Sequence, residues 1–239
     1  MNRSKTNPAA DSIQGPWLMR HSALAYVNQW FVTDRRFMSE LRTKQSGLID
    51  STVLGELAAK YMVARGFKKP TQVDGATTEP LDRRWIEAAA QLDRVLTAAP
   101  LSDVEVHLLA ERLAKVAPRE RTPANELLSA ATKFLWFSGC QDIRILDARA
   151  VDALIRLGAS RSLGKRYDSY AAAWQEQFNA HREELRAAID GLARQLDWTL
   201  IPSAFHDETV MVLRSSWFAD RVFDKYLWTI GEGAATGFV

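Results

Sequence analysis

Apolar residues recur at steps of three and four positions along most of the chain, which is the spacing of one face of an α-helix. The stretch that begins at Pro80 shows this most clearly, because its predicted buried stripe contains Trp85, Ala88, Ala89, Leu92, Val95 and Leu96. No segment alternates apolar and polar residues convincingly enough to predict a sheet. Ordinary helix and loop lengths then give roughly eight to ten helices, so we predict an all-α protein.

Two stretches interrupt this pattern and define the predicted domain organisation. Residues 1–14 contain no amphipathic helix, so we expect a disordered N-terminal arm. Residues 68–79 are polar, contain Pro70 and Gly75 and show no periodicity, which predicts a mobile linker. We assign residues 15–239 to a single helical domain.

Composition excludes several classes of protein. The chain has 239 residues, 47% hydrophobic and 25% charged, with a formal net charge of +2, which is typical of a globular protein and demands neither nucleic acid nor membrane as a partner. Cys140 is the single cysteine and the four histidines are scattered, so we expect no disulfide, no metal and no cofactor. The sequence shows neither a secretory leader nor a long apolar run, so we expect a cytoplasmic protein without membrane contact.

The stretch from Thr122 to Gly158 has the most chemical interest. It predicts a buried helix that carries Lys133, a short turn, and a second helix that begins at Asp147. In the simplest interpretation Asp147 is a helix N-cap, which is compatible with a second, chemical role. Lys133 would then extend its amine to solvent or pair with Asp147.

Two motifs lie in this stretch. The first is Ser-x-x-Thr-Lys-x-Leu-x-Phe at residues 129–137, and the second is Ile-x-Asp-Ala-Arg at residues 145–149, followed by Arg-Leu-Gly at 156–158. Their order and spacing resemble the helix-hairpin-helix DNA glycosylase superfamily. More closely, they resemble bacterial proteins with an 8-oxoguanine DNA glycosylase (OGG) fold, which are similar to components of antiphage operons. The resemblance covers about a sixth of the chain and implies a glycosylase-like helical fold.

The resemblance also implies a reaction and its residues. Lys133 would attack the sugar carbon as a modified base leaves, and Asp147 would stabilise the developing positive charge. The substrate would be DNA or RNA, and the setting would be antiphage defence beside other proteins of the operon. The alternative is a catalytically inactive module used for protein interaction or scaffolding, because Ser129, Ala130 and Ala131 replace the glycine-rich hairpin of the superfamily.

Basic residues concentrate between Arg112 and Arg166, which favours contact with a nucleic-acid backbone. The solvated face of a helix is the simpler explanation, and Arg156 also lies four residues after Asp152, the spacing of a surface ion pair. The candidate nucleic-acid-binding residues are Thr132, Arg144, Arg149, Arg156, Arg161, Lys165 and Arg166.

The C-terminal region is rich in aromatic residues on nearly all faces of one predicted helix, including Trp217, Phe218, Phe223 and Tyr226. Such a helix is either central to the core or shared with a partner, such as a second copy in a homodimer.

Overall fold

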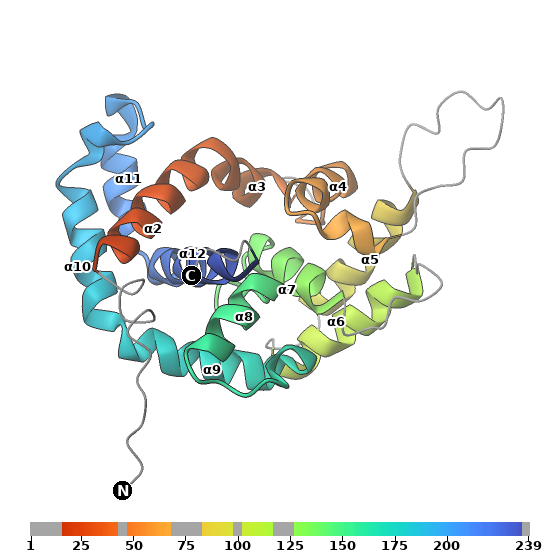
Figure 1. Ribbon diagram of the computed structural model, residues 1–239. Helices are drawn as coiled ribbons and strands as arrows, with labels where there is room; N and C mark the ends of the chain where they lie inside the picture. Colours follow the sequence, from red (N-terminus) through yellow and green to blue (C-terminus); the bar gives the residue numbers. More distant parts are fainter. Residues whose placement is uncertain (1–15, 43–46, 68–82, 98–101, 117–126, 236–239) are drawn as a thin grey trace, which may run out of the picture. The chain divides into compact units, whose positions relative to one another are not determined.

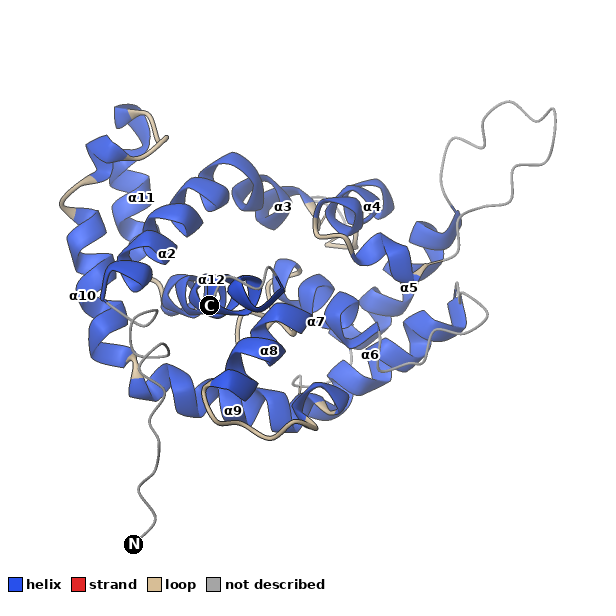
Figure 2. Ribbon diagram, in the orientation of Figure 1, coloured by secondary structure: helices blue, strands red, loops and turns tan. Residues whose placement is uncertain are grey.

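The protein is helical throughout the part that the structure, a computed structural model, describes: residues 16–42, 47–67, 83–97, 102–116 and 127–235. Figure 2 shows helices joined by loops, and within these ranges the only β-type pairing is an isolated bridge between Arg42 and Ile49. The all-α prediction is confirmed. In the same ranges no helix has both the length and the apolar character needed to cross a membrane.

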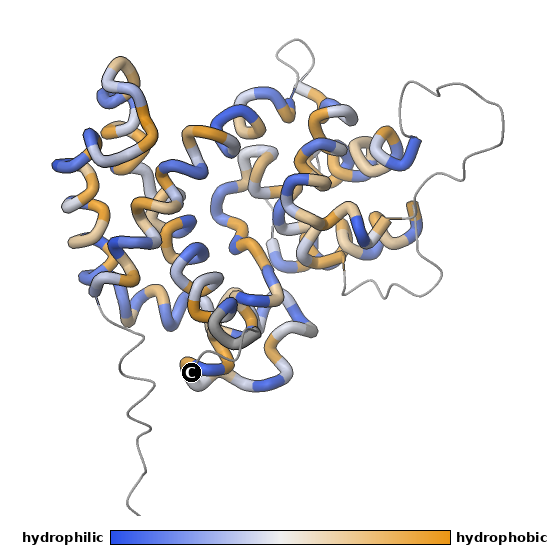
Figure 3. The backbone as a smooth tube through the Cα atoms, turned by 45° about the horizontal axis from the view of Figure 1, so that its top comes forward, coloured by the Kyte–Doolittle hydropathy of each residue, from blue (hydrophilic) through white to orange (hydrophobic). Residues whose placement is uncertain are grey.

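The number of helices also agrees with the prediction. The helix α2 (Pro16–Gln29), the π-helical turn η1 (Trp30–Asp34) and α3 (Arg35–Glu40) follow without interruption, so we count them as one. With α4 to α12 the described residues then contain ten helices. Figure 3 shows hydrophilic and hydrophobic residues alternating within each helix, as expected where one face is buried.

The chain divides into two compact units. The terminal unit comprises residues 1–32, 147–163 and 172–239, and the central unit comprises residues 33–146 and 164–171. The hydrophobic pattern of the sequence predicts a single domain and gives no sign of this division.

The terminal unit is built around its last helix, α12 (Ser216–Ala235). It packs against α2, α8 (Ala148–Arg156) and α10 (Arg182–Ala193) (Figure 1). The buried side chains of α12 include Phe218, Val222, Phe223, Tyr226 and Leu227. Core packing therefore accounts for most of the aromatic residues of this helix. The possibility of a homodimer stays a prediction.

The backbones of α8 and α12 approach very closely at Gly231. A Cβ atom added to Gly231 would lie 2.0 Å from the carbonyl oxygen of Arg149. Only glycine fits there, so the absence of a side chain at Gly231 sets the distance between these two helices.

The central unit contains α3, α4 (Ser51–Lys60), α5 (Arg83–Thr97), α6 (Asp103–Val116) and α7 (Leu128–Phe137). Five of the six residues in the stripe predicted for α5 are buried, and Leu96 is half-buried. The ring of Phe67 lies against Trp85 of α5 and Phe134 of α7, with ring centroids 5.0 and 6.3 Å apart. The aromatic residues of α7 are therefore core residues.

Two long helices expected from the sequence are each broken. Apolar spacing predicts one helix from about Tyr167 to Leu196, but this stretch is interrupted at His181, between α9 (Tyr167–Ala180) and α10. The expected C-terminal helix is divided at Arg214 and Ser215, between α11 (His206–Leu213) and α12. Neither break is marked by glycine or proline, so propensity alone gives no signal for it.

Several expectations fall on residues outside the described ranges. These are the arm at residues 1–14, the linker at residues 68–79, and the start of the Lys133 helix at Thr122. They stay predictions.

Candidate functional site around Lys133

Lys133 lies in the middle of α7, among buried side chains. It is 4% exposed, and its Nζ donates a hydrogen bond of 2.7 Å to Oγ of Ser129, one helical turn earlier. Burial of an amine among apolar residues is costly unless its hydrogen bonds are made. Lys133 therefore does not extend to solvent as the simplest interpretation of the sequence expects.

Ser129 is the surface-facing end of this pair. Nine of the ten residues of α7 are buried, and Ser129 alone is half-exposed. The hydroxyl that accepts from the Lys133 amine thus lies at the position where α7 approaches the surface.

The segment after α7 is held through its backbone. The Thr132 hydroxyl accepts from the amide of Leu146 at 3.1 Å, and the Tyr170 hydroxyl donates to the carbonyl of Ile145 at 2.7 Å. The amide of Arg144 donates to the phenol oxygen of Tyr167 at 2.7 Å. The backbone of residues 144–146, which immediately precede Asp147, is therefore held by three side chains of the central unit.

Thr132 thus has a structural task. Its hydroxyl also lies 3.3 Å from the carbonyl of Ser129, to which it can donate, and its side chain is fully buried. The residue was expected among the nucleic-acid contacts, but its hydroxyl is engaged within the protein. Tyr167 and Tyr170 were not expected at this site, and their spacing gave no signal because they anchor the segment through its backbone.

Asp147 belongs to the terminal unit and begins α8. Its Oδ1 accepts a hydrogen bond of 3.0 Å from the amide of Arg149, and its backbone is extended, as at a helix N-cap. The N-cap interpretation is confirmed. The carboxylate is half-buried. Asparagine caps a helix about as well as aspartate does, so it can replace Asp147 without loss of the cap.

Two of the predicted nucleic-acid contacts point into the terminal unit instead. Arg149 pairs with Glu232 at 3.0 Å, and its guanidinium lies 4.1 Å from the ring centroid of Trp228. Arg156 donates to the carbonyl of Ile230 at 3.3 Å rather than to Asp152. Both arginines therefore tie α8 to α12.

The other predicted contacts differ in their surroundings. Arg166 makes two hydrogen bonds to Asp168, and these bonds, with that from the Ser169 amide, lower the pKa of the Asp168 carboxyl to about 2. Arg161 is exposed, and Arg144 is half-buried. The side chain of Lys165 lies outside the described part of the protein.

The remaining ionisable groups do not suggest another chemistry at this site. Burial raises the pKa of the Cys140 thiol, and Arg42 opposes this only in part, so the thiol is not an activated nucleophile. Among the described residues no three histidine, cysteine or acidic side chains are grouped as metal ligands.

Comparison with known proteins gives no match: no family model, no curated protein and no solved structure is similar to this chain.

Proposed function

We propose that the protein acts on a modified nucleobase in nucleic acid, with the amine of Lys133 as the nucleophile. The observation that supports this most is the buried Lys133 amine, bonded to Ser129 in a helix whose residues are mostly apolar and buried. A core position that only needed to be filled would favour a hydrocarbon side chain, because desolvation of an amine is costly. The resemblance of residues 129–137 and 145–158 to OGG-fold proteins supplies the reaction class.

The reaction is a displacement at the sugar. The neutral Lys133 nitrogen forms a bond to C1′, and the bond from C1′ to the base nitrogen breaks, with its electron pair leaving on the base. The proton released by the amine ends on the base. Cleavage of the bond between C1′ and the ring oxygen then gives a Schiff base, which borohydride reduces to a stable adduct.

This mechanism is tested by trapping on duplex oligonucleotides that contain an abasic site or 8-oxoguanine. Lys133→Met keeps an unbranched apolar side chain in the buried position and removes the amine, so we expect the covalent adduct to fall to background. Lys60→Met changes an exposed lysine of the same unit and should leave the adduct unchanged. Adduct formation by Lys133→Met, or no adduct with wild type on any of these substrates, would contradict the mechanism.

The role predicted for Asp147 is tested by Asp147→Asn. Asparagine retains the N-cap of α8 and removes only the charge. If the carboxylate stabilises the developing cation, trapping slows while the melting temperature stays close to that of wild type. An unchanged rate would leave Asp147 with the capping role alone.

A second candidate function is a catalytically inactive interaction module. The observation that favours it is that Arg149 and Arg156 each have a partner within the terminal unit, which occupies part of two guanidinium groups expected to contact phosphate. Duplex binding that falls steeply with salt supports the nucleic-acid function. Binding that is absent or independent of salt supports the interaction module.

A further inference from the structure

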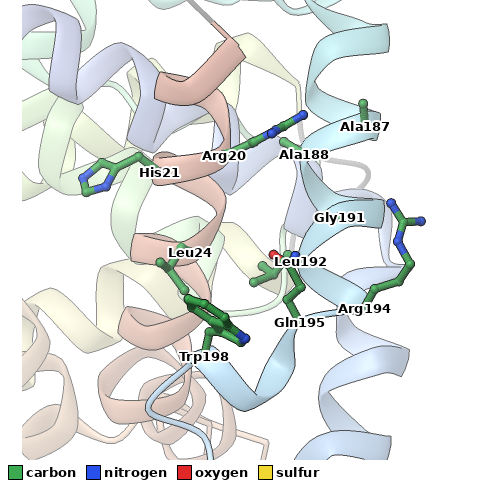
Figure 4. A pocket seen from close by; sticks show the side chains of 10 residues that line it. All are labelled: Arg20, His21, Leu24, Ala187, Ala188, Gly191, Leu192, Arg194, Gln195 and Trp198. Atoms are coloured by element: carbon green, nitrogen blue, oxygen red, sulfur yellow. The ribbon is translucent and has the colours of Figure 1, made fainter.

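A groove lies between α2 and α10 in the terminal unit. Its volume is about 350 Å³, which is within the range of small-ligand sites. Leu24, Ala188 and Leu192 supply apolar lining, and the short connection after α10 contributes Trp198 (Figure 4). The groove therefore has a mixed apolar and polar lining, and it belongs to a single unit.

The groove is open because one helix carries small residues where it faces the other. Ala187, Ala188 and Gly191 line it from α10, and a Cβ atom added to Gly191 would meet no atom within 4 Å. Glycine within a helix is unfavourable. No neighbouring atom requires a glycine at position 191. We therefore assign to Gly191 the role of leaving space for a ligand.

Two arginines give the groove its charge. Arg20 extends from α2 toward α10 in Figure 4, whereas the side chain of Arg194, the residue that follows α10, lies on the side of α10 away from α2 in this view. Both are exposed, and within the described ranges neither guanidinium makes a hydrogen bond or an ion pair. No acidic residue is among the described residues that line the groove. Its charge is therefore complementary to an anion, which guanidinium groups bind through paired N–H donors.

Trp198 adds a flat aromatic surface beside these charges. It is 82% exposed, the highest value among the large apolar side chains of the described residues. An exposed indole of this kind can stack on a planar ring such as a nucleobase. The ligand that satisfies both features has a planar ring and an anionic group a short distance away.

We propose that the groove between α2 and α10 binds a nucleoside phosphate, with its base stacked on Trp198 and its phosphate bound by Arg20. This chemistry occurs in a free nucleotide and in one unit of a single strand. The site is separate from Lys133, which lies in the central unit, so either proposal can fail without the other.

Calorimetric titration of the full chain tests this proposal. The ligands are AMP, a single-stranded hexanucleotide of deoxyadenosine, adenosine without phosphate, and ribose 5-phosphate without base. We expect AMP or the hexanucleotide to bind, and the tighter of the two shows whether the natural ligand is a free nucleotide or a single strand. Adenosine and ribose 5-phosphate should each bind at least about tenfold more weakly, since each lacks one of the two contacts. Adenosine binding as tightly as AMP, or ribose 5-phosphate doing so, would overturn the proposal.

Gly191→Leu is the decisive variant. Leucine is a good helix former and replaces a helix-destabilising residue, so the variant should fold. Because its side chain fills the groove, its affinity for AMP or the hexanucleotide should fall at least about tenfold. Trp198→Ala should have a similar effect, and Met211→Ala, another exposed apolar residue of the same unit, should have none. Equal affinity of Gly191→Leu and wild type, or no binding of AMP and hexanucleotide at millimolar concentration, would contradict the proposal.

Discussion

At the scale of single residues, Asp224 holds two neighbours in the core of the terminal unit. Trp174 Nε1 donates to one carboxylate oxygen at 2.7 Å, and Arg221 donates to the other at 2.7 Å. The side chain of Arg221 is only 7% exposed, so its charge depends on this partner. Asp224→Ala should lower the free energy of unfolding by about 3–5 kcal/mol, because it leaves a buried guanidinium without its carboxylate.

Urea denaturation measures this change. Asp190→Ala, at an exposed position of α10, is the control and should change the free energy of unfolding by about 0.5 kcal/mol or less. A similar small effect for Asp224→Ala would show that Arg221 is balanced by other groups.

Tyr226 makes stability depend on pH in the alkaline range. Its burial, with a smaller contribution from Glu184, raises the pKa of the phenol from 10.0 to about 12. The unfolded chain then loses this proton at a lower pH than the folded protein does. The stability that the neutral phenol contributes is complete below pH 10 and is lost as pH rises to about 12, by about 3 kcal/mol.

The contribution of Tyr226 is isolated by comparison with Tyr226→Phe. The variant has no phenol, so its free energy of unfolding should fall less steeply between pH 10 and pH 12 in chemical denaturation. Parallel curves for the two proteins would assign the alkaline loss to other groups.

At the scale of helices, two glycines on helices should respond in opposite ways to the same change. Gly231→Ala places a methyl group 2.0 Å from the backbone of Arg149, so α8 and α12 must separate and we expect a loss of about 3 kcal/mol or more. Gly191→Ala meets no atom within 4 Å and should stabilise the protein by about 0.5–1 kcal/mol. Thermal and urea unfolding of both variants measure the difference. Equal effects would mean that α8 and α12 are free to shift apart.

The helices also show what periodicity can and cannot predict. The buried stripe of α5 and the N-cap at Asp147 depend on neighbours within a few residues, and the sequence predicts both correctly. Apolar spacing from Leu54 to Met62 predicts a helix that ends near Gly66 with this glycine in the left-handed conformation, whereas α4 ends at Lys60. Met62 takes the left-handed conformation instead, with φ of 56°, and the 3-10 turn η2 (Val63–Gly66) follows. Local propensity favours glycine there, so tertiary packing must impose this geometry.

At the scale of the whole molecule, the all-α class was predictable, whereas the surroundings of the candidate site residues were not. Arg149 and Glu232 are 83 positions apart in the sequence, and Tyr170 and Ile145 are 25 apart. Hydrophobic spacing carries no information about such pairs. The sequence predicts Arg149 and Thr132 as nucleic-acid contacts and Lys133 as extending to solvent or pairing with Asp147. It does not predict the partners that the structure shows, which are Glu232 for Arg149, the Leu146 amide for Thr132 and Ser129 for Lys133.

The division into units has a consequence for the protein during its synthesis. The terminal unit joins α2 to α12, which the ribosome completes last among the described helices, whereas most of the central unit lies between them. At roughly 5–20 residues per second, on the order of 10 to 40 seconds separate the two helices. During that time the apolar face of α2 lacks its final partner. The nascent chain therefore presents a natural binding segment for a chaperone, and the central unit has the opportunity to fold first.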